Sequence, residues 1–303
     1  MSETVRAVVF SAEGLTLAPR ALRPPGPDDV VVRVTHTSLN AGEVRPPPAP
    51  RANGWDFAGT IDDPGSSDLE AGQRVCGFSR AREAWAEKVV VPARDLAPIP
   101  DGVSSDIAAA LPVAAGTALA MVDAAGGALV GSRALVLGTT GGVGSFAVRL
   151  AHRAGCAVTA HVRRDDQVAY ARSLGADEVV VGDIGDAGPF AVVASAVGGP
   201  TLTSALGRLE SDGTAVVVGG AGGAEVGFMP LIGRGRAHLV GLNLYAHSDV
   251  VPPRRWLARL LRLVAADQLE VDPVDLGDWT GLDGAIERFR QRAFLGKGIL
   301  AIG

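Results

Sequence analysis

The chain has 303 residues, of which 47% are hydrophobic, and its formal net charge is −5. It is long enough to fold into two domains with substantial cores, and this composition excludes a disordered or fibrous protein. Because the charge balance is negative and no long basic run occurs, we expect no nucleic-acid partner.

The cysteine content and the length of the apolar stretches exclude further classes of protein. The two cysteines, at positions 76 and 156, are too few for a disulfide framework or a cysteine-rich structural zinc site. The sequence enters an apparent strand without a signal-peptide pattern, and no apolar stretch has the length of a membrane span. We therefore expect a cytoplasmic protein without a membrane partner.

The first hundred residues are typical of a small antiparallel barrel. Short apolar or β-branched runs alternate there with Gly and Pro clusters. The predicted strands cover residues 5–10, 29–35, 56–62, 74–78 and 85–91. Residues 41–53 contain four prolines and form a stiff loop, which either shapes a substrate entrance or simply connects two strands.

A largely buried helix or helix pair follows this region. Ser104 or Ser105 is suited to the N-cap position, and residues 107–125 are nearly all apolar or small. Pro112 and Gly116 interrupt the helical pattern.

Residues 134–162 predict a strand-helix-strand unit that binds a dinucleotide. A buried strand over 134–137 leads into a glycine-rich turn, and a helix over 145–154 and a second strand over 157–162 follow. The turn consists of Gly138, Thr139, Thr140, Gly141, Gly142, Val143 and Gly144. Glycine lets the backbone turn sharply toward an anion, and the first amides of the helix have no intrahelical acceptor, so a pyrophosphate fits there. The spacing G-x-x-G-x-x-G is not the commonest one, and a strand-turn-helix without a ligand remains the alternative.

The end of the second strand favours NADPH. Arg163 and Arg164 could form a forked contact with a 2′-phosphate, whereas an NAD site usually has a carboxylate for the ribose hydroxyls. In the alternative interpretation, Asp165 or Asp166 supplies that carboxylate and the arginines are solvated.

The remaining residues continue the alternation of strands and helices, which predicts a doubly wound parallel sheet. The predicted strands are 178–181, 190–197, 214–219 and 238–242, and the predicted helices are 165–174 and 201–209. After residue 253 we expect helices over 254–266 and 282–292 and strands over 269–274 and 298–302. The last strand could return to the first domain. The predicted division is therefore 1–103, 104–248 and a returning segment 249–303.

Four motifs in this order resemble the medium-chain dehydrogenase/reductase superfamily. They are Gly54-Trp-Asp-Phe-Ala-Gly59, Ala109-Ala-Leu-Pro-Val-Ala-Ala-Gly-Thr-Ala118, the Gly138–Gly144 turn and Gly296-Lys-Gly-Ile-Leu300. Within the superfamily the chain is most similar to the zinc-independent NADPH:quinone oxidoreductase group, which includes zeta-crystallin. The resemblance spans nearly the whole chain. It implies an α/β fold in which a discontinuous GroES-like β-barrel accompanies a doubly wound parallel Rossmann sheet, with the nicotinamide in the cleft between them.

The resemblance also assigns residues. It implies that Asn40 and Thr117 lie near the nicotinamide, and that the turn holding Ser195 and Val197 borders the cofactor. It implies the same for Gly219 and for Asn243, which follows the strand over 238–242. Members of the family often pair their sheets through this strand, so a homodimer is expected.

Two departures from the family pattern bear on the chemistry. Zinc-dependent relatives carry a Gly-His-Glu motif, whereas this chain has Gly54-Trp55-Asp56 and no cysteine near Asn40, which argues against metal-assisted alcohol oxidation. The tyrosine that many quinone reductases carry after the asparagine is absent. Tyr245 is then the candidate proton donor, with solvent as the alternative.

The sequence therefore predicts an NADPH-dependent, metal-independent oxidoreductase that transfers hydride to a quinone or a conjugated enone, with Asn40 and Tyr245 as the candidate catalytic residues. Such a small-molecule acceptor is already electrophilic, so protein groups need only orient it and stabilise the developing charge. The alternative is an NADPH-binding regulatory or structural protein with little turnover, which the missing tyrosine keeps open.

Overall fold

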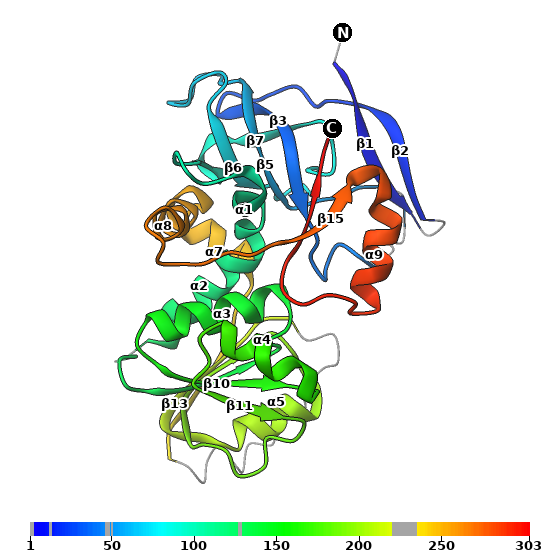
Figure 1. Ribbon diagram of the computed structural model, residues 1–303. Helices are drawn as coiled ribbons and strands as arrows, with labels where there is room; N and C mark the ends of the chain where they lie inside the picture. The colour runs from blue at the N-terminus through cyan, green and yellow to red at the C-terminus, as the bar shows by residue number, and fades with distance from the viewer. Residues whose placement is uncertain (1–2, 12–13, 46–48, 50, 127–128, 220–234) are drawn as a thin grey trace. The chain divides into compact units, whose positions relative to one another are not determined.

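The computed structural model describes residues 3–11, 14–45, 49, 51–126, 129–219 and 235–303 (Figure 1). The prolines at 46–48 and 50 of the predicted stiff loop lie outside the described residues. The chain forms two compact units. The first unit contains Met1–Gly116 and Ser248–Gly303, and the second contains Thr117–His247.

The second unit is built on a parallel sheet of six strands. They are β9 (Arg133–Leu137), β10 (Ala157–Val162), β11 (Glu178–Val181), β12 (Phe190–Ser195), β13 (Leu209–Val217) and β14 (Ala237–Gly241). Their order is β11-β10-β9-β12-β13-β14, and every neighbouring pair is parallel. This arrangement confirms the predicted doubly wound sheet.

Helices precede, connect and follow these strands. They are α2 (Gly116–Ala125), α3 (Gly142–Arg153), η3 (Asp165–Gln167), α4 (Val168–Ser173), α5 (Gly199–Leu206) and α7 (Leu244–Val250). α3 contacts β9 and β10, and α5 contacts β9, β12 and β13. The strand order reverses between β9 and β12, so right-handed crossovers place α3 and α5 on opposite faces of the sheet. The glycine turn after β9 therefore lies at the switch point, where open α/β sheets bind ligands.

The first unit contains two sheets. The smaller sheet pairs β1 (Thr4–Ser11) with β2 (Gly14–Ala21) and β4 (Arg51–Ala52). The larger sheet contains β3 (Asp29–Ser38), β5 (Asp56–Asp63), β6 (Arg74–Phe78), β7 (Lys88–Pro92), β8 (Leu96–Pro98), β15 (Val274–Asp278) and β16 (Gly298–Ala301). β16 pairs antiparallel with β3, so the end of the chain completes the sheet that the N-terminal region begins.

Two strand predictions in this unit were inaccurate. The strand expected over 269–274 is β15, which begins only at Val274, because its parallel pairing with β16 starts at the Val274–Gly298 pair. The strand expected from residue 85 begins at Lys88, where pairing with β3 starts. β2, β4 and β8 were not predicted.

The helices of the first unit are short, with one exception. They are η1 (Ala93–Asp95), α1 (Ser105–Ala109), the π-helical turn η2 (Leu111–Ala115), α8 (Pro253–Ala265), η4 (Trp279–Gly281) and α9 (Leu282–Arg290). α1 contacts β3, β5 and β6, which is why residues 104–116 pack with the first unit although the sequence prediction begins the second domain at 104. None of the helices among the described residues has both the length and the apolar character needed to cross a membrane.

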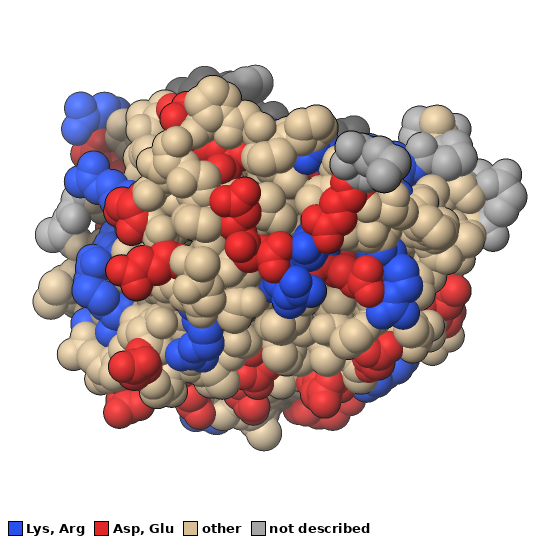
Figure 2. Space-filling view, turned by 90° about the horizontal axis from the view of Figure 1, so that it is seen from above, with Lys and Arg blue, Asp and Glu red and all other residues tan. Residues whose placement is uncertain are grey.

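The core of the first unit is a cluster of aliphatic and aromatic side chains that includes Val32, Phe57, Trp85, Trp279 and Leu300. Trp279 and Leu300 come from the C-terminal segment, so this segment supplies part of the core as well as a strand. On the face shown in Figure 2, acidic and basic side chains are interspersed, without a large area of one sign.

Candidate functional site

The glycine turn of the second unit is fixed by close backbone packing. Gly138 has a φ of +82°, a conformation that favours glycine. A Cβ atom built on Gly144 would lie 2.0 Å from the carbonyl oxygen of Gly138, so no other residue fits at position 144 without a backbone shift. α3 begins at Gly142, three residues earlier than predicted, because the Ser145 amide already donates to Gly141 O at 2.9 Å.

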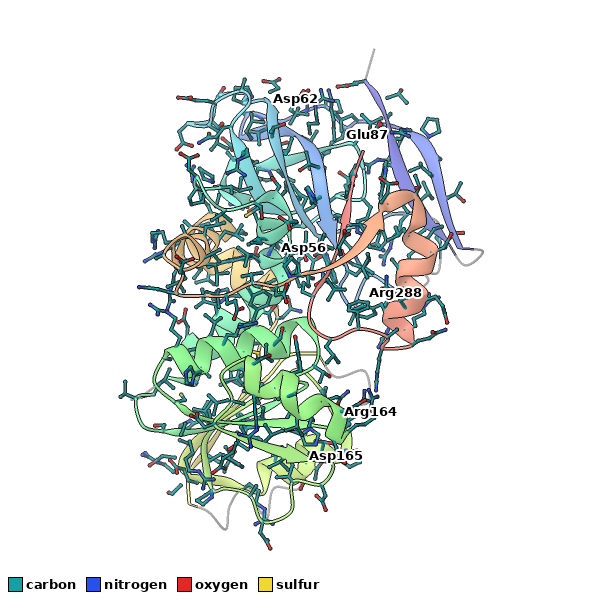
Figure 3. All side chains as sticks on the ribbon, viewed as in Figure 1. Asp56, Asp62, Glu87, Arg164, Asp165 and Arg288 are labelled. Carbon is teal, nitrogen blue, oxygen red and sulfur yellow. The ribbon has the colours of Figure 1, made fainter. Side chains whose placement is uncertain are left out.

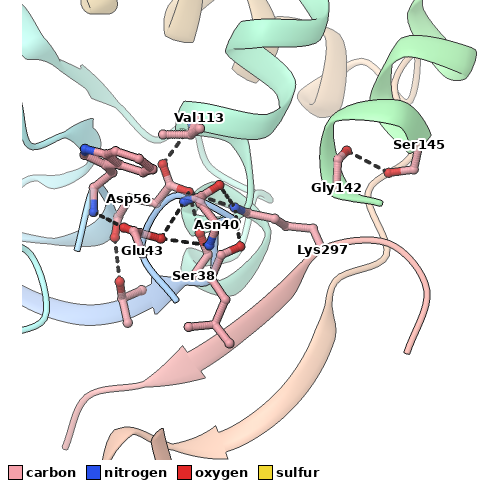
Figure 4. Close-up of polar contacts among 11 residues, drawn as sticks. Ser38, Asn40, Glu43, Asp56, Val113, Gly142, Ser145 and Lys297 are labelled. Carbon is pink, nitrogen blue, oxygen red and sulfur yellow. Dashed lines mark hydrogen bonds and ion pairs between the residues drawn. The ribbon is translucent and has the colours of Figure 1, made fainter. Parts of the chain in front are cut away.

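The first turn of α3 presents unpaired backbone donors. The amides of Gly142, Val143 and Gly144 donate no hydrogen bond to any part of the chain that the structure describes, and the N-cap residue Gly141 has no side chain to cap them. The Ser145 hydroxyl donates to Gly142 O at 2.9 Å and thus stabilises the same turn (Figure 4). Three open amides at the positive end of a twelve-residue helix are suited to bind an anion.

The ends of three strands meet at this turn. A Cβ on Gly138 would lie 3.1 Å from Cγ1 of Val197, and the Ala196 amide donates to Leu137 O at 3.2 Å. A Cβ on Gly219 would lie 3.9 Å from Ala196 O. The structure therefore brings the predicted residues Gly138, Val197 and Gly219 together.

Two predicted hydroxyls are used within the chain. The buried Ser195 hydroxyl donates to Val197 O at 2.6 Å and accepts from the Val197 amide at 3.3 Å, so it shapes its own turn. The Thr139 hydroxyl, also buried, donates to Val136 O at 3.2 Å. Thr140 is half-buried.

Arg163 and Arg164 are exposed just after β10, where Figure 3 shows Arg164 beside Asp165. The backbone amide of Arg163 donates to Gln167 Oε1 at 3.1 Å. The guanidinium of Arg163 takes no part in this hydrogen bond. Arg164 Nε lies 3.0 Å from Asp166 Oδ1, so one of the two predicted cations pairs with one of the two alternative carboxylates.

The other predicted residues of the second unit lie on helices. Asn243 caps α7, because its Oδ1 accepts from the amides of Tyr245 at 2.9 Å and Ala246 at 3.3 Å. Tyr245 is half-buried in the first turn of that helix. Thr117 is buried at the start of α2.

In the first unit, Asn40 belongs to a buried polar cluster (Figure 4). We call this set the Lys297 cluster; its members are Ser38, Asn40, Glu43, Asp56 and Lys297. Each of these residues is at least nine-tenths buried. Ser38 ends β3, Asp56 begins β5 and Lys297 directly precedes β16, so the sheet brings together residues from both ends of the sequence.

Lys297 uses all three of its ammonium hydrogens. Its Nζ donates to Leu39 O at 3.0 Å, to Asn40 Oδ1 at 2.5 Å and to Asp56 Oδ2 at 2.9 Å. The three acceptors surround a compact ammonium group, which the planar fork of an arginine would not match.

Asp56 accepts further hydrogen bonds. Its Oδ2 receives the Ser38 hydroxyl at 2.5 Å and Asn40 Nδ2 at 2.8 Å, and its Oδ1 receives the Val113 amide at 2.8 Å. Val113 lies in the π-helical turn η2. Because the backbone hydrogen bonds of this turn are irregular, the Val113 amide donates to the carboxylate and not to a helix carbonyl. Pro112, which interrupts the predicted helix, thus lies in the segment that supports Asp56.

The carboxamide of Asn40 has no hydrogen left for a ligand. Its Nδ2 donates to Glu43 Oε2 at 2.9 Å and to Asp56 Oδ2 at 2.8 Å, while its Oδ1 accepts from Lys297. A carboxamide has two N–H donors, so only the second lone pair of Oδ1 remains. Asn40 can therefore accept one more hydrogen bond but cannot donate one without breaking the cluster.

Glu43 has a strongly perturbed pKa. Its carboxyl group accepts from the Asn40 amide at 2.7 Å and from the Trp55 amide at 2.5 Å. Burial, together with the neighbouring charge of Asp56, raises the pKa of Glu43 from 4.5 to about 8, although Lys297 and the N–H donors favour the ionised form. A proton on Glu43 at neutral pH keeps the cluster close to zero net charge, since Asp56 and Lys297 neutralise each other.

Trp55 occupies the position of the histidine in the Gly-His-Glu motif. A Cβ on Gly42 would lie 2.4 Å from its Cη2, and the guanidinium carbon of Arg82 lies 4.3 Å from its ring centroid. Arg82 also donates to Gly42 O at 2.6 Å and has a φ of +62°, an uncommon conformation for arginine. Within the described ranges no group of three or more His, Cys, Asp or Glu side chains is arranged to hold a metal ion.

The sequence analysis assigned no role to Lys297 or to Glu43. A signal for Lys297 was available, because it is one of only two lysines in a chain whose other basic residues are arginine, and it lies in the Gly296–Leu300 motif. No comparable signal distinguishes Glu43, because its proximity to Asp56 arises from strand pairing.

Family models match both units. "Alcohol dehydrogenase GroES-like domain" matches residues 26–101, and "Zinc-binding dehydrogenase" matches residues 142–264. The acrylyl-CoA reductase AcuI of Ruegeria pomeroyi is 31% identical over 262 residues, which cover 78% of this chain and 77% of that protein. Quinone oxidoreductase-like protein 2 of Rattus norvegicus is 32% identical over 230 residues, covering 69% of this chain and 65% of that protein.

Solved structures agree in fold. A thermostable alcohol dehydrogenase from Pyrobaculum aerophilum has a TM-score of 0.86 and 26% identity, with 99% of this chain and 100% of that chain covered. A mycobacterial protein solved in complex with NADPH has a TM-score of 0.86 and 22% identity, with 98% and 99% covered. These matches confirm the predicted fold class, a doubly wound Rossmann sheet with a GroES-like domain.

Proposed function

Because the chain belongs to the medium-chain dehydrogenase/reductase superfamily, in its quinone oxidoreductase group, we propose that this oxidoreductase uses NADPH to reduce a quinone or a conjugated enone. The observation that supports cofactor binding most directly is the set of three open amides at Gly142, Val143 and Gly144.

The residues of the second unit fit a dinucleotide. The amides of α3 would hold the pyrophosphate, and the absence of a Cβ at Gly144 keeps the turn tight. Arg163 and Arg164 would bind the 2′-phosphate, for which Arg164 would share its guanidinium between the phosphate and Asp166. When bound, NADPH supplies the hydride.

The protein groups orient the acceptor and supply or relay a proton. We propose that Asn40 acts only as a hydrogen-bond acceptor, because both of its N–H groups already donate to the carboxyl groups of Glu43 and Asp56. The acceptor gains hydride at carbon and a proton at oxygen or at the neighbouring carbon. Tyr245 or water donates this proton.

The residues do not fit a catalytic zinc ion. Trp55 offers no lone pair at the position of the histidine ligand, and the oxygens of Glu43 and Asp56 already accept hydrogen bonds from N–H, O–H or ammonium groups. We therefore propose a metal-independent reaction, and alcohol oxidation of the zinc-dependent type is disfavoured.

We also propose that the protein is a homodimer that pairs through β14. This strand is the last in the described sheet, and Leu239 in its middle is 50% exposed. An edge strand with an exposed leucine is a surface that another copy of the strand can cover.

The first experiment follows NADPH absorbance with a panel of quinones and conjugated enones, with NADH in parallel and a metal chelator present. We expect oxidation of NADPH with at least one acceptor, slower oxidation of NADH and no effect of the chelator. NADPH binding without turnover on any acceptor would favour a regulatory or structural role. Loss of activity with the chelator would contradict the metal-independent mechanism.

Arg163 and Arg164 provide the test of cofactor preference. We expect the Arg163→Ala/Arg164→Ala variant to bind NADPH about tenfold to a hundredfold more weakly, because each charge-assisted hydrogen bond contributes about 1.5–3 kcal/mol. NADH binding should change little. Titration of both cofactors by fluorescence measures the ratio, and the exposed Arg153→Ala serves as the control. Equal losses of affinity for NADPH and NADH would rule out that these arginines recognise the 2′-phosphate.

A further inference from the structure

A pocket in the first unit, outside the residues assigned above, combines arginines with a buried carboxylate. Its volume is about 380 Å³. The loop after β6, the end of β7 and the 3-10 helix η1 form its walls. Its charged residues are Arg23, Arg80, Arg94, Asp95 and Asp249.

Asp95 is the unusual member of this set. It is 2% exposed, and among the described residues its carboxylate accepts no hydrogen bond. Its nearest cation is Arg94, whose Nε lies 4.0 Å from Oδ1, too far for a hydrogen bond. Burial raises the pKa of Asp95 to about 6, while Arg94 and Arg80 oppose this shift and Asp29 adds to it. A buried acceptor of this kind costs stability unless a donor from the pocket reaches it.

Arg94 is the available cation beside it. Arg23 pairs with Asp29 at 2.6 Å and donates to Val90 O at 3.0 Å, and Arg80 pairs with Asp249 at 2.5 Å. The side chain of Arg94 is 69% exposed, and its one ion-pair contact with the described residues is the 4.0 Å approach to Asp95. The pocket thus presents guanidinium donors next to an acceptor that has no donor.

The charges select the sign of the ligand. Asp29 and Asp249 neutralise Arg23 and Arg80, so Arg94 is the cation that remains for a ligand, and it favours an anionic group. The anion must also carry a hydrogen that it can donate to Asp95. A phosphate group with one proton meets both conditions, because P–OH donates to the carboxylate while the other oxygens accept from Arg94. Sulfate has no proton at neutral pH, so the Asp95 carboxylate repels it.

We propose that the pocket lined by Arg94 and Asp95 binds a protonated phosphate group, either free phosphate or a phosphate monoester. The volume exceeds that of a phosphate ion, and a second pocket of about 470 Å³ shares Pro92 and Arg94 with the first. An organic group attached to the phosphate would therefore have room.

Calorimetry with inorganic phosphate, sulfate and glycerol 1-phosphate at neutral pH tests the site. We expect phosphate to bind at least about tenfold more tightly than sulfate. Tighter binding of glycerol 1-phosphate than of inorganic phosphate identifies an esterified ligand, and the reverse identifies the free ion. Equal binding of phosphate and sulfate would overturn the proposal.

Two variants test whether phosphate binds at Arg94 and Asp95. Asp95→Asn replaces the negative carboxylate by a neutral carboxamide, which no longer repels sulfate and can donate to it, so the preference for phosphate over sulfate should fall to about one. Arg94→Gln should weaken phosphate binding about tenfold and leave the buried Asp95 carboxylate in place. Arg51→Gln removes an exposed arginine of β4 outside the pocket and should change neither. Phosphate binding that Arg94→Gln leaves intact would assign the ion to another site, such as the amides of α3, and would refute the proposal.

Discussion

At the scale of single residues, the Lys297 cluster decides what Asn40 can do. The family resemblance placed Asn40 near the nicotinamide, and the structure adds that its carboxamide is held at all three of its bonded positions by Glu43, Asp56 and Lys297. Its orientation is therefore fixed by three buried side chains. The proposed role of Asn40 as an acceptor depends on Lys297, which donates to its Oδ1.

Loss of the Lys297 ammonium should destabilise the protein strongly. Lys297→Met leaves Asp56 buried without its counter-charge, and breaking such a pair costs about 3–5 kcal/mol of the free energy of unfolding. Lys297→Arg should recover only part of this, because a planar guanidinium does not match the three acceptors. Urea unfolding measures the loss.

Lys88→Met is the matched control. Lys88 is the other lysine of the chain and pairs with Glu3 and Asp62 nearer the surface, so its loss should cost about 0–1 kcal/mol. Equal losses for the two lysine variants would contradict the importance of the buried cluster.

The titration of Glu43 should appear in the pH dependence of stability. Its pKa in the folded protein, about 8, lies above the ordinary 4.5, so the folded state holds a proton that the unfolded state has released. The contribution of this group is complete below pH 4.5 and is lost as the pH rises through about 8. Glu43→Gln cannot ionise and should flatten this decline. Urea midpoints measured across this range test the prediction, and parallel pH curves for both proteins would contradict it.

At the scale of elements, the glycine turn shows that one missing Cβ can control a site. Gly144 lies in the first turn of α3, directly against the carbonyl oxygen of Gly138, whereas Gly141 has ordinary contact distances. The two glycines thus have the same spacing in the sequence pattern but different steric demands.

Gly144→Ala should therefore distort the turn and weaken NADPH binding at least about tenfold, because the three open amides would no longer converge on one anion. Gly141→Ala should have a much smaller effect, since its Cβ would lie 3.5 Å from Gly138 O and its φ is −97°. Fluorescence titration with NADPH compares the two variants. Equal losses would show that helix propensity, rather than the close contact, governs the site.

At the scale of the whole molecule, β14 is an edge strand of the parallel sheet among the described strands, and it is where we propose that two copies pair. Leu239→Lys should raise the dissociation constant of this proposed dimer at least about tenfold, because a charge on the middle of the edge strand opposes pairing. Sedimentation over a range of concentrations measures this. Leu17→Lys, at an exposed leucine of β2, is the control. A dimer that resists the first substitution would pair through another surface.

The sequence by itself determined the parallel sheet of the second unit and the place of the glycine turn. Strands such as β10 and β11 were predicted at their observed bounds because they are short apolar runs ended by glycine or arginine, and such signals are local. The proposed cofactor residues around Gly138 followed from the same local signals and from the family resemblance.

Only the tertiary structure decided how the first unit is completed and how the polar groups pair. β15 was misplaced and β2 was missed, because their positions depend on pairing with strands elsewhere in the chain. Lys297 lies 241 residues from Asp56 along the sequence, and their contact exists only because β16 pairs with β3 and β3 with β5. The raised pKa of Glu43 is likewise a consequence of burial. The same holds for the hydrogen bonds that occupy both N–H groups of Asn40 and for the Asp95 carboxylate, which lacks a donor among the described residues. No local sequence pattern predicts burial of this kind.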